Sequence, residues 1–480
     1  MKQLVGLVIA LFFIGCSGVS SSGGKSTGSS GDSTSGSSLN STDDTPDFDD
    51  FKYQQWYLET NEWFYAKYDV NPDAHIHPNE NTYYTYTGKN SVTDQRVRVA
   101  IIDEGFDTSH PELSDNIIAS YTFDEDGNHT SGISKSISSN HGTAVSGIIA
   151  ASDQIQGIAR DVELILIQMP ELISDDTVVA MFEKAIQEGA ELINCSWGYE
   201  DNNLDVTQYL RDEINGFVEG NSSNDGVNII FASGNDDIKF TKAFASIKNV
   251  ITVGATNKHN LRTDYSNYGE ELDIVAPGGE ELGISTLDIS GFFGATTDDY
   301  IEFDDYGSFT GTSAAAPIVT GALALLLDKY NKDSNNADDL NATQINEKIK
   351  TATDHIGDEE PYLDDMIVSN VLAPTITGIL GTNGDTQLQI LFRNYDNDGT
   401  YGPYDLTTIY GDNGFQAIIS NDLIEGNYAI DLVDKDDNTK VYATDQNFEI
   451  NTSAITNYNS DIKQSNYYGY GKLNLSKLLE

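Results

Sequence analysis

Short, uninterrupted runs of apolar residues recur between residues 96 and 279 and alternate with longer stretches of helical character. The runs are RVRVAIID, VELILIQM, AELINCSWG, VNIIFASGN, NVITVGAT and ELDIVAPGG. Because their apolar residues are continuous and do not alternate with polar ones, both faces of each strand are expected to be covered. The pattern therefore predicts an α/β domain in which a parallel sheet is flanked by helices.

The pattern changes after residue 357, where apolar and polar residues begin to alternate with a period of two. Segments such as TQLQILF and NYAIDLV are separated by turn signals, and DLVDKDDNTKVYA is typical of a hairpin with a polar loop. We interpret residues 358–455 as an inserted small all-β module of the β-sandwich type. The alternative is that these strands merely extend the first domain.

The first fifty residues predict an export signal and a tether. An apolar run from Leu4 to Ile14 is shorter than a comfortable membrane span and is followed by Gly15 and Cys16. Residues 1–16 resemble a bacterial lipoprotein signal peptide, in which Cys16 would become the lipidated first residue. The alternative is an ordinary secretory signal with an incidental cysteine. Residues 17–50 are rich in Ser, Gly, Thr and Asp, a composition typical of a flexible tether.

Composition limits the partners and the means of stabilisation. The chain has 480 residues and carries 26 Lys and Arg against 76 Asp and Glu, a formal net charge of −50. Such a surface repels phosphate backbones, so no nucleic-acid partner is expected. The second of the two cysteines, Cys195, lies in an apolar segment and is interpreted as a buried structural thiol. With Cys16 lipidated, no internal disulfide is expected.

Four polar residues are expected at one edge of the predicted sheet. Asp103 ends the first strand, and Asn235 follows the strand that ends in ASGN. His141 and Ser313 each stand at the start of a helix of small residues, in HGTAVSGIIA and SFTGTSAAAPIVTG. In open parallel sheets, active residues gather at the carboxyl ends of the strands. Taken singly, each residue has a simpler explanation as a helix cap or a turn residue.

Together the four residues supply the chemistry for attack on a peptide bond. Ser313 would be the nucleophile, and its small neighbours would let a peptide backbone approach. His141 would take the serine proton, and Asp103 would orient the imidazole and stabilise its charged form. Asn235 and the backbone N–H of Ser313 would donate to the developing oxyanion. The joint occurrence of all four in small-residue, glycine-bearing contexts favours an active site over four separate caps.

These motifs resemble those of the subtilases, the subtilisin-like serine proteases of peptidase family S8. VAIIDEGFDTSHPEL, HGTAVSGIIA, ASGN and GTSAAAPIVTG match the aspartate, histidine, asparagine and serine motifs of the family. With INCSWG and LDIVAPG, the resemblance covers about residues 55–356, and it resumes in YGYGKLNLSKLL at the C-terminus. It implies a subtilisin-like peptidase domain made of residues 51–357 and 456–480. It also implies a triad of Asp103, His141 and Ser313 with Asn235 as the oxyanion donor.

The resemblance also implies two substrate-binding segments and shows three departures. Residues Ser196, Trp197 and Gly198 would line one side of the specificity pocket, and residues Ala232, Ser233 and Gly234 the other. Trp197 is large enough to reshape the cleft. The departures are Glu104, where the family usually has Thr or Ser, Ala314, where Met is common, and Ile318, where His is common. None of them removes a catalytic atom.

The expected partners follow from this resemblance and from the export signal. The chemistry requires no cofactor, whereas the acidic clusters DEDGN from Asp124 and DNDGTYG from Asp396 leave a structural calcium ion open, with no ligands assigned. The sequence thus predicts a serine endopeptidase acting on proteins or peptides. It would be an exported lipoprotein of the cell envelope, anchored in the membrane and facing the periplasm or the exterior. The alternative is a catalytically silent surface scaffold or binding protein.

Overall fold

The computed structural model describes most of the chain from residue 51 onward. The described residues are 51, 54–58, 62–78, 85–91, 93–133, 139–198, 206–220, 226–239, 244–291, 294–296, 298–304, 308–330, 340–354, 356, 470, 472–479 and seven strands between 362 and 450. The predicted signal peptide with Cys16, and the predicted tether, lie outside these residues.

Ten strands in the described part of the chain form one sheet, in the order β11-β19-β8-β7-β6-β5-β1-β4-β2-β3. Neighbouring strands from β19 to β2 run parallel, whereas β11 and β3 pair antiparallel at the two ends. All six apolar runs predicted as strands belong to this sheet. The strands are β1 (Arg98–Asp103), β2 (Ile117–Phe123), β3 (His129–Ser131), β4 (Glu163–Gln168), β5 (Leu192–Cys195), β6 (Asn228–Ala232), β7 (Ile251–Thr256), β8 (Ile274–Pro277), β11 (Thr353–Asp354) and β19 (Lys472–Leu473).

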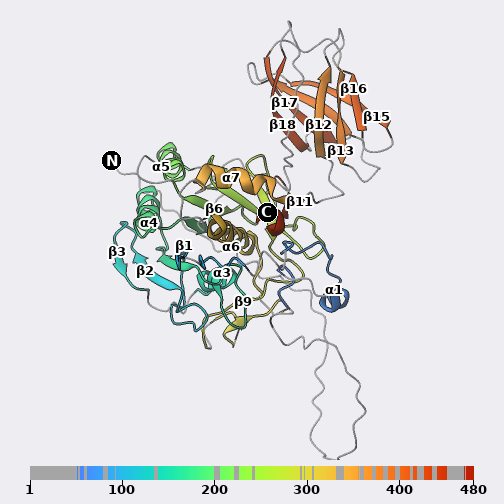
Figure 1. Ribbon diagram of the computed structural model, residues 1–480. Coiled ribbons are helices and arrows are strands. Elements are labelled where there is room, and N and C mark those ends of the chain that lie inside the picture. The colour runs from blue at the N-terminus through green and yellow to red at the C-terminus, as the bar shows by residue number, and fades with distance from the viewer. Residues whose placement is uncertain are drawn as a thin grey trace, which may run out of the picture.

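Helices cover both faces of this sheet (Figure 1). Successive residues of β1 point to opposite faces, so that Val99 and Ile101 join one apolar cluster and Ala100 and Ile102 join the other. Helices α3 (His141–Ala150) and α6 (Thr312–Tyr330) pack in the first cluster, and α4 (Asp175–Gln187) and α5 (Gln208–Glu219) pack in the second. The predicted α/β fold, with a mostly parallel sheet flanked by helices, is confirmed.

Short elements complete the domain around these layers. They are α1 (Glu62–Tyr68), the 3-10 helix η2 (Phe244–Ser246), the paired strands β9 (Thr286–Leu287) and β10 (Tyr300–Ile301), α7 (Ala342–Thr351) and α8 (Leu475–Leu478). The segment that precedes α1 is anchored to the loop before β9, because Trp56 donates its indole N–H to the Gly283 carbonyl at 2.9 Å and Tyr57 donates its hydroxyl to the Ser285 carbonyl at 3.2 Å.

The strand order brings the carboxyl ends of β1, β5 and β6 side by side. From β1 the chain proceeds to β2, β3 and β4 on one side of the sheet, then crosses to β5 and continues outward to β8 on the other side. In open α/β sheets, binding sites form outside the carboxyl ends of the strands where the order reverses in this way. The backbone therefore defines the position of the site before any side chain is considered.

A second sheet is made of the seven strands between residues 362 and 450. It is antiparallel, in the order β12-β13-β16-β15-β14-β17-β18. Strands β17 and β18 pair as the predicted hairpin, with Val433 opposite Val441. The bounds are β12 (Tyr362–Ser369), β13 (Thr375–Gly381), β14 (Leu388–Asn394), β15 (Thr400–Tyr410), β16 (Gly414–Ile418), β17 (Gly426–Asp434) and β18 (Val441–Ile450).

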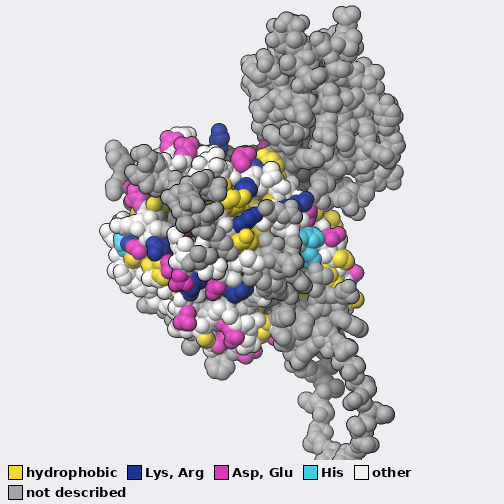
Figure 2. Space-filling view, in the orientation of Figure 1, with side chains coloured by type: hydrophobic (Ala, Val, Ile, Leu, Met, Phe, Trp, Pro, Cys, Tyr) yellow, Lys and Arg dark blue, Asp and Glu magenta, His cyan; other side chains and the backbone are white. Residues whose placement is uncertain are grey.

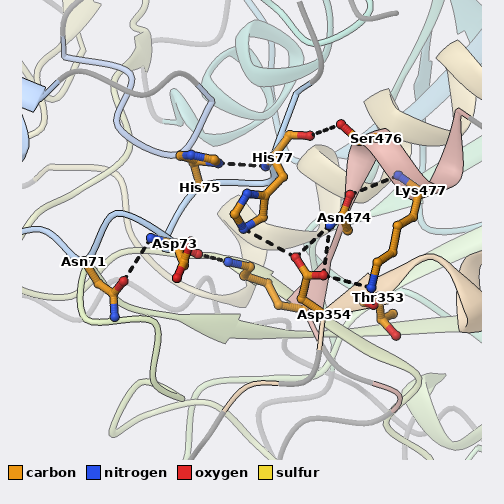
Figure 3. Close-up of polar contacts among 10 residues, drawn as sticks. Asn71, Asp73, His75, His77, Thr353, Asp354, Asn474, Ser476 and Lys477 are labelled. Atoms are coloured by element: carbon orange, nitrogen blue, oxygen red, sulfur yellow. Dashed lines mark hydrogen bonds and ion pairs between the residues drawn. The ribbon is translucent and has the colours of Figure 1, made fainter.

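The chain segments before and after the second sheet meet at the edge of the first one. Asp354 in β11 is opposite Lys472 in β19. The Asp354 carboxylate accepts hydrogen bonds from the Asn474 amide at 2.9 and 2.8 Å and lies 3.3 Å from Nε2 of His77 (Figure 3). Lys472 is fully buried and donates to the Asp73 carbonyl, and burial lowers its pKa to about 8. This cluster ties both ends of the intervening segment to the N-terminal part of the domain.

The surface of the described residues carries both signs of charge. On the face shown in Figure 2, acidic side chains stand among basic ones. Ion pairs such as Arg98 with Glu163, at 2.9 Å, are partly exposed, and such pairs contribute only about 0 to 1 kcal/mol each. None of the helices that the structure describes is long and apolar enough to cross a membrane.

Candidate active site

Asp103 and His141 meet at the carboxyl edge of the sheet. Nδ1 of His141 lies 3.0 and 2.9 Å from the two carboxylate oxygens of Asp103. Both side chains are buried, with 1% and 7% of their surface exposed. Asp103 is the last residue of β1 and His141 the first of α3, so the element boundaries themselves set up this contact. A carboxylate that accepts from Nδ1–H leaves Nε2 as the nitrogen able to accept a proton.

The two residues after His141 hold the loop that follows β1 against α3. A Cβ on Gly142 would lie 2.5 Å from the carbonyl oxygen of Gly105, so the close approach requires glycine. The hydroxyl of Thr143 accepts from the backbone N–H of Asp107 at 2.9 Å. The small residues of the HGT motif therefore serve to fix the imidazole against the carboxylate.

The surroundings of His141 suit a base that works at neutral to alkaline pH. Burial lowers the pKa of His141, but the charge and hydrogen bond of Asp103 and the charge of Glu104 outweigh it and raise the pKa above its ordinary value of 6.5. Because only the neutral imidazole can accept a proton, the fraction of His141 that can act as a base falls as the pH drops through that raised pKa.

Ser313, the second residue of α6, interlocks with Ser196. The Ser313 hydroxyl donates to the Ser196 carbonyl at 3.1 Å, and the Ser196 hydroxyl donates to the Ser313 carbonyl at 3.0 Å. The Ser313 carbonyl is open to this bond because Pro317, four residues on, has no N–H to donate to it. Ser313 thus lies inside the helix and its hydroxyl does not cap it, which excludes the simpler explanation of this motif.

His141 and Ser313 reach the site from two neighbouring helix starts. Helices α3 and α6 pack against each other, and the His141 ring meets Phe309, which lies just before α6, edge to face at 5.4 Å between ring centroids. In this structure the Ser313 hydroxyl proton is directed at Ser196. This hydrogen bond must therefore break, and the hydroxyl hydrogen must turn about the Cβ–Oγ bond, before the proton can pass to His141.

Asn235 is held in one orientation by Thr312. Its side-chain oxygen accepts from the backbone N–H and from the hydroxyl of Thr312, each at 2.9 Å. The Thr312 hydroxyl also accepts from the Gly234 N–H at 3.1 Å, which leaves its own hydrogen for the bond to Asn235. Since a backbone N–H can only donate, the Asn235 oxygen must face Thr312 and the amide NH₂ must face away from it. Asn235 thus presents donors and no acceptor to the space beyond Thr312, as an oxyanion requires.

The first predicted substrate-binding segment follows β5. The Ser196 backbone is fixed by Ser313, and a Cβ on Gly198 would meet open space. The sequence suggested that the bulk of Trp197 would reshape the cleft. Its side chain is instead only 3% exposed, and it packs edge to face on Phe231 and Phe244, with 5.5 and 5.0 Å between ring centroids. The apolar cluster behind the sheet takes up the indole, so that Trp197 presents mainly its backbone beside Ser313.

The second predicted segment, which consists of Ala232, Ser233 and Gly234, begins at the last residue of β6 and is held by Asn267. The Asn267 side chain donates to the Ser233 carbonyl at 3.1 Å and accepts from the Asp236 N–H at 2.9 Å. Gly234 has a φ of +102°, and a Cβ there would lie 2.3 Å from the Asn267 amide nitrogen. The sequence offered no signal for Asn267, which lies in a loop between β7 and β8.

The acidic clusters of the sequence left a structural calcium ion open. Within it, no three His, Cys, Asp or Glu side chains are grouped so that they could hold an ion. Asp124 of the DEDGN cluster uses its carboxylate within its own turn, where it accepts from the N–H groups of Asp126 at 3.1 Å and Asn128 at 2.9 Å. In the cluster that begins at Asp396, the residues from 396 to 399 lie outside the part of the chain that the structure describes.

Known proteins are similar in sequence to this domain. A sequence model described as "Subtilase family" matches residues 94–382. The major intracellular serine protease of Bacillus subtilis (strain 168) is 30% identical over 259 residues, which cover 51% of this chain and 72% of that protein. Subtilisin NAT of Bacillus subtilis subsp. natto is 28% identical over 288 residues, 58% of this chain and 64% of that protein. A solved protease structure from Pseudoalteromonas arctica PAMC 21717 aligns over 64% of this chain and 91% of its own, with a TM-score of 0.49 and 21% identity.

Proposed function

The chain belongs to the subtilase family and is a subtilisin-like serine endopeptidase, and we propose that Asp103, His141 and Ser313 are its catalytic triad. The observation that carries the proposal is the buried contact between Nδ1 of His141 and the Asp103 carboxylate, at the sheet edge near the start of α6, where Ser313 is the second residue. Subtilase chemistry requires no cofactor, so the reaction needs only these side chains, the donors to the oxyanion, the bound peptide and a water molecule.

The reaction proceeds through an acyl-enzyme, in which the acyl group of the substrate is transferred first to Ser313 and then to water. The Ser313 oxygen attacks the peptide carbonyl while Nε2 of His141 takes the hydroxyl proton, and Asp103 stabilises the imidazolium. The imidazolium then protonates the departing amine, and the acyl group stays on Ser313. A water molecule, deprotonated by His141, then attacks the ester. The bond between the acyl group and the Ser313 oxygen breaks, the imidazolium returns the proton to that oxygen, and the second product leaves.

Two donors act on the oxygen of the tetrahedral intermediate. One is the amide NH₂ of Asn235, whose orientation Thr312 determines. The other is the backbone N–H of Ser313, which lies in the first turn of α6, where no helix carbonyl is available as an acceptor. The N-terminal end of the helix dipole also favours negative charge at this position.

The substrate backbone would lie between the segment from Ser196 to Gly198 and the segment from Ala232 to Gly234. These segments follow the adjacent strands β5 and β6 and flank Ser313. Hydrolysis of an unstructured protein such as casein tests the function directly. A catalytically silent scaffold would leave casein intact at every pH.

We propose further that Cys16 is lipidated and anchors the enzyme to a membrane of the cell envelope. The support is the apolar run that ends in Gly15 and Cys16, followed by the Ser- and Gly-rich segment. Replacing Cys16 by Ser is expected to move the protein from the membrane fraction to the soluble fraction, because the acyl chains supply the attachment. Fractionation by ultracentrifugation checks this, and equal membrane partitioning of the two proteins would refute lipidation.

The seven strands between residues 362 and 450 are proposed to form a separate inserted module, residues 358–455, which recognises protein substrates or partners. The pairing of Asp354 with Lys472 supports this, because it holds the two ends of the insertion together without the module. Replacing residues 358–455 by a short Gly/Ser linker is expected to preserve cleavage of a short fluorogenic peptide and to weaken cleavage of a folded protein. A deletion variant that is unfolded or inactive on the peptide would show that these strands belong to the catalytic core.

A further inference from the structure

A second acidic side chain adjoins the Asp103–His141 pair. The backbone N–H of Glu104 donates to Oδ1 of Asp103 at 2.8 Å, and its carbonyl accepts from the Gln168 amide at 2.8 Å. The Glu104 side chain is half-buried, and the Ser139 side chain beside it lowers the pKa of its carboxylate. The Ser139 hydroxyl in turn accepts from the backbone N–H of His141 at 3.4 Å. Glu104 thus contacts Asp103 through its backbone, and its side chain lies beside Ser139, which contacts His141.

The ionisable groups whose charges act on Glu104 come from β1, from α3 and from the segment after β4. They are Asp103, His141 and the exposed Glu171. Of these, only His141 can carry a positive charge. Burial and the charge of Asp103 raise the pKa of Glu104 to about 7, against the opposing effects of His141 and Ser139. On the neighbouring strand β5, burial and Asp103 raise the pKa of the Cys195 thiol, so that this group stays neutral.

We propose that Glu104 is a positioning residue whose ionised carboxylate stabilises the His141 imidazolium formed when Ser313 loses its proton. The inference rests on the proposed function, because it needs His141 to act as the base. The carboxylate acts through His141 and touches no reacting atom. Because Glu104 and His141 are coupled, their protons leave in two macroscopic steps that belong to the pair.

The pH dependence of kcat/KM on a short peptide distinguishes this role from a structural one. Glu104→Gln keeps the shape of the side chain and removes its charge. In this variant the acid limb of the pH profile, where kcat/KM falls as the pH drops, is expected to move to lower pH, because His141 loses an influence that raises its pKa. The plateau at alkaline pH should fall about two- to fivefold, the range for a partly exposed charge pair. Glu104→Asp should keep the acid limb nearer to that of the unmodified enzyme.

The matched control is Glu171→Gln, which removes an exposed carboxylate at the same edge of the sheet. It should displace the acid limb and the plateau far less than Glu104→Gln does, because the effect of Glu171 on Glu104 is the weakest of those that act on it. If Glu104→Gln leaves the acid limb in place, or if Glu171→Gln displaces it equally, the proposed role of Glu104 is wrong.

A second readout does not depend on turnover. In a Ser313→Ala background, the imidazole of His141 is titrated by NMR with Glu104 present and in Glu104→Gln. The expected result is a lower titration midpoint in Glu104→Gln, and an unchanged midpoint would overturn the inference. If the enzyme cleaves no peptide at all, the proposed function fails, whereas a normal enzyme with an unaltered midpoint means that only the role of Glu104 fails.

Discussion

Ser313→Ala and His141→Ala are each expected to lower kcat for peptide hydrolysis by about a million-fold, a magnitude known for triads of the subtilisin type. Ser313→Ala removes the only atom that forms the acyl bond, and His141→Ala removes the group that accepts the serine proton. Since each step needs both residues, the double variant should be hardly worse than either single one. Steady-state kinetics on a fluorogenic peptide measures the loss.

The control for both variants is Ser114→Ala, which changes an exposed serine away from the site. Its kcat should equal that of the unmodified enzyme. All three variants should keep the unmodified melting temperature within a few degrees, because none of them removes a large core side chain. Turnover in Ser313→Ala above a few per cent of the unmodified rate would mean that a different residue is the nucleophile.

Asn235→Ala is expected to lower kcat by about 100- to 1000-fold with little change in KM. The amide NH₂ would meet the oxyanion only in the transition state, so its loss leaves ground-state binding nearly intact. Thr312→Val is the graded comparison, because it removes the hydroxyl that donates to Asn235 and keeps the backbone N–H that does the same. It should lose less activity than Asn235→Ala.

Kinetics on the same peptide over a range of substrate concentrations separates kcat from KM for both variants. A loss of only a few-fold in Asn235→Ala would remove this residue from the mechanism. A larger loss in Thr312→Val than in Asn235→Ala would show that Thr312 acts on Ser313 independently of Asn235.

The central strands could be predicted because their burial is recorded in the sequence itself. Strand β1 is buried from Val99 to Asp103, and its apolar run has no polar interruption. Strand β2 was not predicted, since most of its residues are only half-buried and its apolar residues mix with Ser, Tyr and Thr. Strands β11 and β19 have two residues each and show no period, so only their pairing across more than a hundred residues defines them.

The sequence predicted those features of the candidate site that depend on local motifs. Asp103 and His141 were expected at an element boundary, and the structure joins them there. Thr312 belongs to the serine motif, but its hydrogen bonds to Asn235 join residues far apart in the sequence and could not be predicted from the motif. The direction of the Trp197 side chain could not be predicted, because it depends on the space left by Phe231 and Phe244.

Labelling with a fluorophosphonate tests the central claim most directly, because the reagent modifies a serine only where a base and an oxyanion site activate it. The protein is incubated with the reagent, digested and mapped by mass spectrometry, with Ser313→Ala and His141→Ala treated in parallel. The account predicts a single adduct on Ser313, formed faster as the pH rises through the pKa of His141 and absent from both variants. Folded protein that hydrolyses no peptide and carries no adduct on Ser313, or that is labelled at another serine, would contradict it.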